Sequence, residues 1–363
     1  MISKLLVNQF KCIDSVELEL ASLNLLTGPN STGKSTLIQA LLLLAQCIRR
    51  GEMRHGESLL NGEFAKLGTA QDVRNIYTNQ KKCVISFEME HGQFVSGEMV
   101  FEENDEEDSI KLTNAQLFKN VDIIYLNHDR VGVKDIYDKN LENVSRIGTA
   151  GEYAFDYLSR NRLEPLPEPD FSVEVTKVGM NLGNQVDYWL EKIMGYRVSA
   201  EGIESTNYVR VVYQQSQSNR KLRPYHIGTG VSYVANVIVA ALSCKKGSIF
   251  IVENPEIHLH PAAQSKLLEF FVYLSTRGLQ IFVETHSDHI FNGVRKLIHK
   301  GTMKKEDTAV YLMKKNEMEC SEAVRIEITG EGKIKNQQKG LFDQFDDDLD
   351  ELLRSEERRV GKE

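Results

Sequence analysis

The sequence is poor in cysteine, and the cysteines that it has are scattered. Five cysteines are present among 363 residues, none of them in a C-x-x-C pair. This spacing predicts neither disulfides nor a zinc site and instead suits reduced, mostly buried thiols. With 41% hydrophobic and 26% charged residues, the composition is that of an ordinary globular protein and not of a disordered chain.

Long apolar runs and an excess of basic charge are also missing. The longest apolar stretch, residues 37–48, is interrupted by Gln39 and Gln46 and is shorter than the roughly 18–20 residues that span a bilayer. Lys4 stands where a secretory signal would need apolar residues, so we expect a cytoplasmic protein with no membrane partner. The net charge of −8 argues against a generally basic surface that binds nucleic acid. DNA could then bind only at local basic patches.

One short motif carries most of the chemistry. Residues 28–35 match G-x-x-x-x-G-K-[ST] between an apolar run and a long apolar helix, which is the context of a phosphate-binding loop. Backbone N–H groups of such a loop surround an anion, and the helix directs its positive end at the same place. We expect Lys34 to reach the β- and γ-phosphates, Ser35 to bind Mg²⁺ and Thr36 to lie near the α-phosphate. The nucleotide-binding residues expected here are Gly28, Asn30, Ser31, Thr32, Gly33, Lys34, Ser35 and Thr36.

Two further apolar segments end in polar residues of the kind found at nucleotide sites. Residues 247–253 form an apolar run that ends in Glu253, as a Walker B strand does when its acid reaches Mg²⁺ through water. Residues 280–284 form a similar run, soon followed by His286, whose neutral imidazole could hold a γ-phosphate or the attacking water. The carboxyl ends of parallel strands meet at one edge of a sheet, so these groups should converge.

The pattern along the chain predicts an α/β fold. Two short antiparallel strands precede the loop, a hairpin is expected at 83–88 and 94–101, and strands and helices alternate from residue 230 onward. The late strands are unbroken apolar runs, typical of a parallel sheet buried on both faces, so the two ends of the sequence should share one sheet. Residues 102–108 are expected to be a solvated acidic turn, and 342–353 an acidic amphipathic helix.

With these motifs in this order, the sequence resembles the ABC-type ATPase heads, and more closely the OLD-like bacterial ATPases of the AAA group, without a nuclease module. The resemblance extends from Phe10 to His289. It implies a P-loop fold of ABC-head type, a mixed sheet flanked by helices, with an antiparallel β lobe and an inserted α+β region. We expect an N-terminal ATPase lobe at 1–127, the insertion at 128–227, a C-terminal lobe at 228–340 and a tail at 341–363, of which 354–363 look like a cloning scar.

The resemblance also implies a second subunit. In this family a glycine-rich signature precedes the Walker B strand, and residues 228–232 stand at that place. Carried over, Gly230 and Ser232 would contact the γ-phosphate held by the opposite molecule of a homodimer. A simple helix-start turn is the alternative reading.

One departure from the ABC pattern bears on catalysis. Asn254 stands where ABC heads usually have the glutamate that polarises water, and an amide cannot accept a proton. Either Glu256 supplies the carboxylate, or His286 positions the water without one, or hydrolysis is slow, and we expect slow turnover. The catalytic residues expected are Glu253, Glu256 and His286, and Ser35 and Glu253 are expected to bind the metal.

The function expected is a Mg-ATP-dependent switch that dimerises around ATP, hydrolyses it slowly and governs a separate effector in a prokaryotic defence or DNA-linked system. A nucleotide-dependent scaffold with negligible hydrolysis and a P-loop small-molecule kinase are the alternatives. Two further interpretations of the sequence have less support. One is a metal site among His258, His260, His286 and His289, and the other is a nuclease-type acidic cluster at 346–348.

Overall fold

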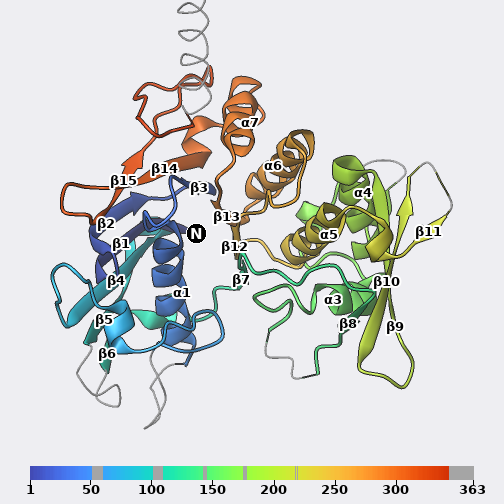
Figure 1. Cartoon of the computed structure of the whole chain (residues 1–363), viewed down its shortest axis with the longest axis horizontal. Coiled ribbons are helices and arrows are strands. Elements are labelled where there is room, and N and C mark those ends of the chain that lie inside the picture. Colours follow the sequence, from blue (N-terminus) through green and yellow to red (C-terminus); the bar gives the residue numbers. More distant parts are fainter. Residues whose placement is uncertain are drawn as a thin grey trace, which may run out of the picture.

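The architecture centres on a six-stranded mixed sheet in the order β15-β14-β3-β13-β12-β7 (Figure 1). The structure is a computed structural model that describes residues 1–50, 60–100, 109–141, 145–174, 178–216, 218 and 220–342. All neighbours in this sheet run parallel except β15, which is antiparallel to β14. The strands are β3 (Leu23–Thr27), β7 (Ile123–Leu126), β12 (Ile249–Glu253), β13 (Gln280–Glu284), β14 (Thr308–Lys315) and β15 (Ser321–Arg325).

This sheet joins distant parts of the chain, as expected from the unbroken apolar runs. β3 lies between β13 and β14, so the strand that leads into the phosphate loop is flanked by two strands from the C-terminal third. Every residue of β3, β12 and β13 is buried, because helices cover one face and a second sheet with its helix covers the other.

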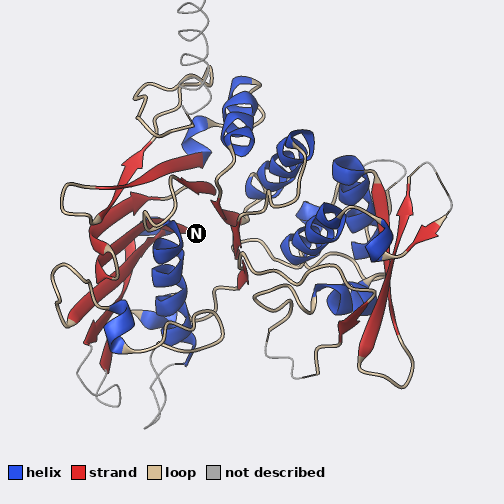
Figure 2. Ribbon diagram, viewed as in Figure 1, coloured by secondary structure: helices blue, strands red, loops and turns tan. Residues whose placement is uncertain are grey.

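An antiparallel lobe forms the second layer (Figure 2). Its five strands run in the order β2-β1-β4-β5-β6, and α1 packs with this sheet and with the central sheet in one hydrophobic core. Both the predicted opening pair and the predicted hairpin are confirmed. The elements are β1 (Ile2–Phe10), β2 (Ile13–Glu19), β4 (Lys82–Met89), β5 (Gln93–Val100), β6 (Ser109–Thr113), α1 (Lys34–Arg50) and α2 (Ala70–Val73), with short 3-10 turns η1 (Glu90–Gly92) and η3 (Ala115–Leu117).

The inserted region adds a small sheet and two helices. β10 pairs with β8, β9 and β11, all antiparallel, and the helices lie on one face of this sheet (Figure 1). The elements are β8 (Ile136–Asp138), β9 (Tyr196–Gly202), β10 (Tyr208–Gln215), β11 (Lys221–Leu222), α3 (Ala154–Asn161) and α4 (Leu182–Met194), with η4 (Pro169–Phe171) and η5 (Pro224–His226).

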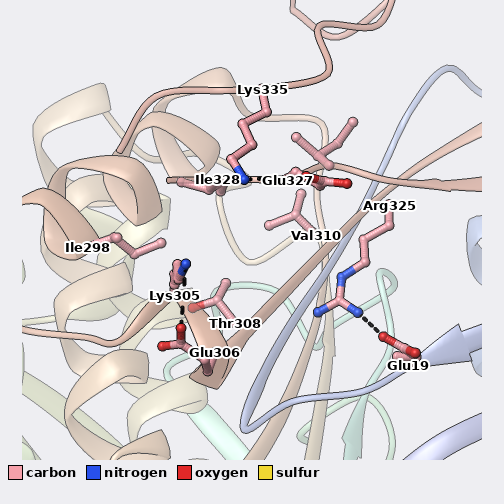
Figure 3. A pocket seen from close by; sticks show the side chains of 11 residues that line it. Glu19, Ile298, Lys305, Glu306, Thr308, Val310, Arg325, Glu327, Ile328 and Lys335 are labelled. Atoms are coloured by element: carbon pink, nitrogen blue, oxygen red, sulfur yellow. Dashed lines mark hydrogen bonds and ion pairs between the residues drawn. The ribbon is translucent and has the colours of Figure 1, made fainter. Parts of the chain in front are cut away.

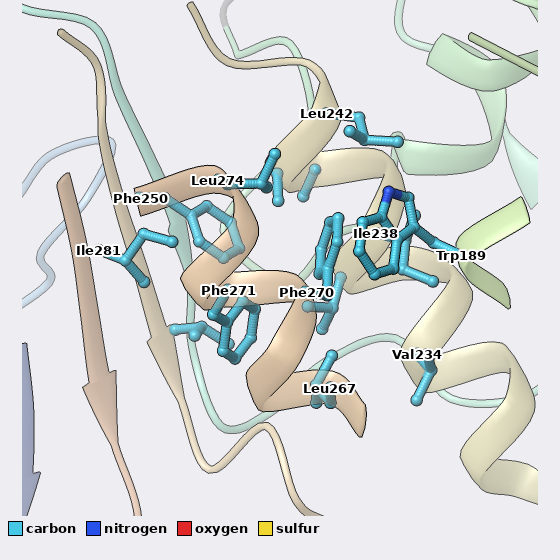
Figure 4. Close-up of a cluster of buried hydrophobic side chains, with 14 of the residues drawn as sticks. Trp189, Val234, Ile238, Leu242, Phe250, Leu267, Phe270, Phe271, Leu274 and Ile281 are labelled. Carbon is cyan, nitrogen blue, oxygen red and sulfur yellow. The ribbon is translucent and has the colours of Figure 1, made fainter. Parts of the chain in front are cut away.

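The insertion shares its core with the C-terminal helices α5 (Thr229–Leu242), α6 (Pro261–Ser275) and α7 (Asp288–His299). Figure 4 shows Trp189 of α4 against Phe270 of α6, whose ring centroids are 4.9 Å apart. The same cluster reaches Ile238 of α5 and Ile281 of β13. One continuous core therefore fixes the insertion, α5 and the central sheet relative to one another.

Two sequence predictions fall outside the described residues. The first is the acidic turn at 102–108, which lies wholly outside the described residues. The second is the acidic helix at 342–353, of which only residue 342 is described. The 3-10 turn η6 (Lys305–Asp307) leads into β14.

Candidate nucleotide site

The phosphate loop connects β3 to α1 in a conformation that depends on its glycines. Gly28 and Gly33 have φ values of 131° and 97°, and Ser31 also lies in the left-handed region at 62°. A Cβ atom at Gly28 would collide with the backbone carbonyl of Met313, and one at Gly33 with the side chain of Ser321. Only glycine fits at these two positions. α1 begins at Lys34, so the N-terminus of the helix faces the loop.

Lys34 is folded against the loop that precedes it. Its ammonium group donates to the carbonyls of Gly28 and Pro29 at 2.9 and 2.7 Å and is only 4% exposed. Burial lowers the pKa of Lys34, and the nearby carboxylate of Glu284 opposes that shift. Thr32 donates its hydroxyl to the Pro29 carbonyl, and therefore supports the loop.

Two carboxylates lie side by side at the ends of neighbouring strands. Glu253 of β12 and Glu284 of β13 are in register, and both are 3% exposed. Ser35 donates its hydroxyl to Glu284 at 2.9 Å. Burial and the charge of Glu253 raise the pKa of Glu284 to about 7.

Glu253 has partners of its own. Its carboxylate accepts a hydrogen bond from the Tyr125 hydroxyl at 2.8 Å and lies 3.0 Å from His128 Nδ1. Burial, followed by the charge of Glu253, raises the pKa of Tyr125, which keeps this phenol a hydrogen-bond donor at neutral pH.

His286 and Glu256 occupy the loops that follow these strands. The Glu256 carboxylate accepts from the backbone N–H of His286 at 2.8 Å, and burial raises its pKa. Burial and the charge of Lys34 lower the pKa of His286, so its imidazole is neutral at neutral pH.

Most of these groups line one cavity of about 540 Å³, namely Lys34, Ser35, His128, Glu253, Glu284 and His286. The predicted residues that line it are Asn30, Ser31, Gly33, Lys34, Ser35, Thr36, Glu253 and His286. Asn254 also lines it, whereas Glu256 is not among its lining residues and instead holds the backbone at His286. The far end of the cavity is formed by Lys11, Cys12, Asp72, Arg74 and Ile76.

The structure differs from expectation at the predicted signature. Gly230 and Ser232 are both buried, and the Ser232 Oγ has no hydrogen-bond partner in the described part of the chain. Ser232 lies one turn inside α5, and its side chain is buried in the core of its own chain. Gly228 and Thr229 form the exposed tip of α5 instead.

Four site residues escaped the sequence analysis: Glu284, Tyr125, His128 and Arg130. Glu284 had a usable signal, since it ends an apolar strand as Glu253 does. The other three lie in β7 or just after it, and they become neighbours of Glu253 only because β7 pairs with β12.

The four histidines of the weaker metal reading make separate contacts. His286 lines the cavity, the ring of His258 lies 5.3 Å from that of Tyr233, His260 Nδ1 accepts from the Ala262 backbone N–H at 3.3 Å, and His289 lies 3.6 Å from Asp288. Across the described ranges, no group of three or more His, Cys, Asp or Glu side chains is arranged to hold a metal ion.

A second cavity of about 410 Å³ lies beside β14 and β15 (Figure 3). Its rim cations are already paired, Lys305 with Glu306, Arg325 with Glu19 and Lys335 with Glu327. It lacks a glycine-rich loop and a helix start, so the cavity at Lys34 is the candidate nucleotide site.

The comparisons with known proteins agree with this geometry. Residues 88–292 match the family described as "AAA domain, putative AbiEii toxin, Type IV TA system". The chain belongs to this AAA-domain family. Residues 1–161 also match the family "AAA ATPase domain", and residues 303–352 match a protein family of unknown function, DUF3696. No curated protein matches the chain.

Solved structures show the fold of this AAA-domain protein. An Smc head bound to the C-terminal winged-helix domain of ScpA is similar with a TM-score of 0.50 and 12% identity, covering 90% of this chain and 97% of that one. An Smc head from Pyrococcus furiosus with an extended coiled coil, bound to the C-terminal domain of ScpA, has a TM-score of 0.50 and 10% identity over 90% and 96% of the two chains. The chain thus has an α/β fold similar to the ABC-type head of SMC proteins. No helix in the described ranges is long and apolar enough to cross a membrane.

Proposed function

We propose that this AAA-domain protein binds Mg-ATP at Lys34 and hydrolyses it slowly. The observation that carries the proposal is the convergence of Lys34, Ser35, Glu253, Glu284 and His286 on one cavity. A lysine on a glycine-rich loop, a hydroxyl at the helix start and strand-end acids are the parts that phosphoryl transfer requires.

The residues present fit a magnesium ion. Glu253 and Glu284 are adjacent, and burial together with the charge of Glu253 raises the pKa of Glu284, so a dication between the two carboxylates would relieve an unfavourable interaction. Mg²⁺ in nucleotide sites needs only one or two protein carboxylates, because water and phosphate supply the other ligands. Ser35, Glu253 and Glu284 would hold it, and when bound it neutralises charge on the phosphate oxygens.

The side chains around the γ-phosphate end of the cavity support the proposal of slow turnover. Lys34 supplies positive charge, and the neutral ring of His286 can orient water. Asn254 cannot act as a general base, and Glu256 is turned to the His286 backbone. Glu256 therefore acts through His286 as a positioning residue.

The exposed tip of α5 supports a dimer. Gly228 and Thr229 are exposed, yet neither lines the cavity of its own chain. We propose that the tip, through Gly228 and Thr229 in place of Ser232, completes the nucleotide site of a second copy. ATP contacting both copies would have higher affinity for the dimer, which is what a ligand-driven switch requires.

We further propose that the ATP-driven dimer controls a separate effector in a prokaryotic defence or DNA-linked system. The family description, which names a putative toxin of a type IV toxin–antitoxin system, supports an ATPase that works with a partner. The test for an effector is capture of proteins encoded beside this chain, with and without Mg-ATP.

The experiment for the dimer is sedimentation of the purified protein with and without Mg-ATP. We expect the mass to double with Mg-ATP and to return to that of the monomer when Mg²⁺ is chelated. An unchanged mass would remove the dimer while leaving ATP binding to be tested separately.

A scaffold with negligible hydrolysis is the second candidate, favoured by Asn254 alone. ATP-dependent dimerisation without measurable phosphate release, also in the presence of DNA or a captured partner, would select the scaffold.

A further inference from the structure

Behind the nucleotide cavity lies a buried cation, Arg130, that the phosphate-loop chemistry does not use. It follows β7 and is 4% exposed. Its guanidinium donates to the backbone carbonyls of Asn127 at 3.0 Å, of Glu253, and of Asn254 at 2.7 Å. A buried guanidinium is tolerated only where its N–H donors are paired, and these three backbone carbonyls supply that pairing for Nη1 and Nη2 of Arg130.

The loop that Arg130 holds is strained. Asn254 and His258 have φ values of 44° and 62°, a region that residues other than glycine rarely adopt. The backbone N–H of Asn254 also donates to the Glu284 carbonyl at 2.7 Å. The start of the loop is therefore fixed from two sides, and such strain persists only where surrounding contacts enforce it.

The other end of the same loop touches the signature helix. The ring of Tyr233 on α5 lies 5.8 Å from Arg130 Cζ and 5.3 Å from the ring of His258. Gly230 of α5 is so close to this loop that a Cβ atom would meet the His258 carbonyl at 2.5 Å. A continuous set of contacts thus runs from Glu253 through Arg130 to the start of α5.

Several polar atoms in this region are buried without a partner. In the described part of the chain these atoms are Arg130 Nε, Asn127 Oδ1, Asn254 Oδ1 and Glu256 Oε2. Buried polar atoms without partners are unfavourable, and a small shift of the loop could satisfy them. The loop therefore has a physical reason to adopt a second arrangement.

We propose that Arg130 is a positioning residue that couples the phosphate end of the cavity to the exposed tip of α5. This inference rests on the proposed function, because it concerns how ATP at Lys34 sets the dimerising surface. Movement of the Glu253 backbone changes the carbonyls that Arg130 holds, and Tyr233 and His258 transmit the change to α5. Arg130 touches neither phosphate nor water in this scheme.

The test compares ATP affinity with turnover in Arg130→Ala and Arg130→Lys. We expect the Kd for Mg-ATP to stay within about threefold of wild type, while kcat and ATP-driven dimerisation fall by about tenfold or more. Guanidinium ion at millimolar concentration should restore part of kcat in Arg130→Ala. It should not do so in Arg130→Lys, where the lysine side chain fills the space but its single nitrogen cannot reproduce the two separate donor nitrogens of the guanidinium fork.

Two further variants separate coupling from folding. Tyr233→Leu leaves the buried cation in place and should also lower kcat and dimerisation without changing the Kd. Arg162→Ala is the matched control, because Arg162 donates to the Val198 carbonyl and to Asp187 in the insertion, away from the site. It should leave the Kd, kcat and dimerisation as in wild type.

Wild-type kcat and dimerisation in Arg130→Ala, or a Kd that weakens in parallel with kcat, would overturn the inference. If Arg130→Ala does not fold, the Tyr233→Leu variant decides. Unchanged kcat and dimerisation in Tyr233→Leu would overturn the inference, whereas a loss of both at an unchanged Kd for Mg-ATP would support it. A wild-type protein that binds no Mg-ATP would instead overturn the proposed function, and with it the basis of this inference.

Discussion

At the scale of single residues, the site is defined by two acids that stand next to each other. Glu253 and Glu284 end adjacent parallel strands in register. Burial, and then the charge of Glu253, raise the pKa of Glu284 to about 7, so two ionised carboxylates at this place are electrostatically unfavourable. Active sites commonly hold such groups at a cost to stability.

Glu284→Gln should therefore stabilise the nucleotide-free protein at alkaline pH. The raised pKa of Glu284 means that its neutral form favours the folded state. This contribution is complete below the ordinary glutamate range and is lost as the pH rises through about 7. In EDTA at pH 8 we expect the variant to be more stable than wild type by about 1–3 kcal/mol, and at pH 4 to be equal to it.

The measurement is urea unfolding at both pH values. Glu19→Gln, at an exposed carboxylate away from the cavity, is the control and should show no such pH dependence. A Glu284→Gln variant that is less stable than wild type at pH 8 would show that the carboxylate pair is not strained.

Asn254 is a second residue whose identity has both a structural and a catalytic consequence. Asparagine tolerates its left-handed backbone, at φ 44°, better than glutamate does. Asn254→Glu should cost about 1–2 kcal/mol of stability and yet raise kcat about tenfold or more, because it adds a general base.

Phosphate release at saturating Mg-ATP measures this effect. Asn254→Gln has a similar backbone strain without a carboxylate, so it should lose stability and gain no rate. If Asn254→Glu is no faster than wild type, the amide is not what limits turnover.

At the scale of elements, the proposed dimer depends on the contact between α5 and the loop after β12. Gly230→Ala would push a methyl group into the His258 carbonyl, and a backbone atom cannot move aside cheaply. We expect ATP-driven dimerisation to weaken about tenfold or more, while the Kd of the monomer for Mg-ATP stays within about threefold.

Sedimentation and nucleotide titration on the same preparation separate the two effects. Gly330→Ala is the matched control, since nothing lies within 4 Å of the added atom. Dimerisation of Gly230→Ala at the wild-type level would mean that this packing does not set the surface.

The elements also show how far the sequence could predict the site. The phosphate loop, β12, β13 and the helices after them follow from apolar runs and one local motif, so their positions were predictable. Arg130, Tyr125 and His128 were not, because no local pattern marks them and only the pairing of β7 with β12 brings them to Glu253. The burial of Ser232 was not predictable either, because the spacing of the signature residues does not indicate which side of α5 faces the core.

At the scale of the whole molecule, one sheet brings the nucleotide site together. β3 supplies the phosphate loop, β12 and β13 supply the acids, and β7 supplies the residues behind them. The insertion and α5 share one hydrophobic core, so a displacement of α5 would also displace the packed side chains of the insertion. The roles proposed for the acids, for Arg130 and for α5 all require a nucleotide in the cavity at Lys34.

Thermal unfolding with and without Mg-ATP tests that claim most directly. At about 100 times its Kd, Mg-ATP should stabilise the wild type by about 2.7 kcal/mol. Lys34→Ala should abolish the shift, whereas Lys192→Ala, which removes a lysine on α4 beside Trp189, should keep it. No shift in the wild type, or an equal shift in Lys34→Ala, would contradict the account.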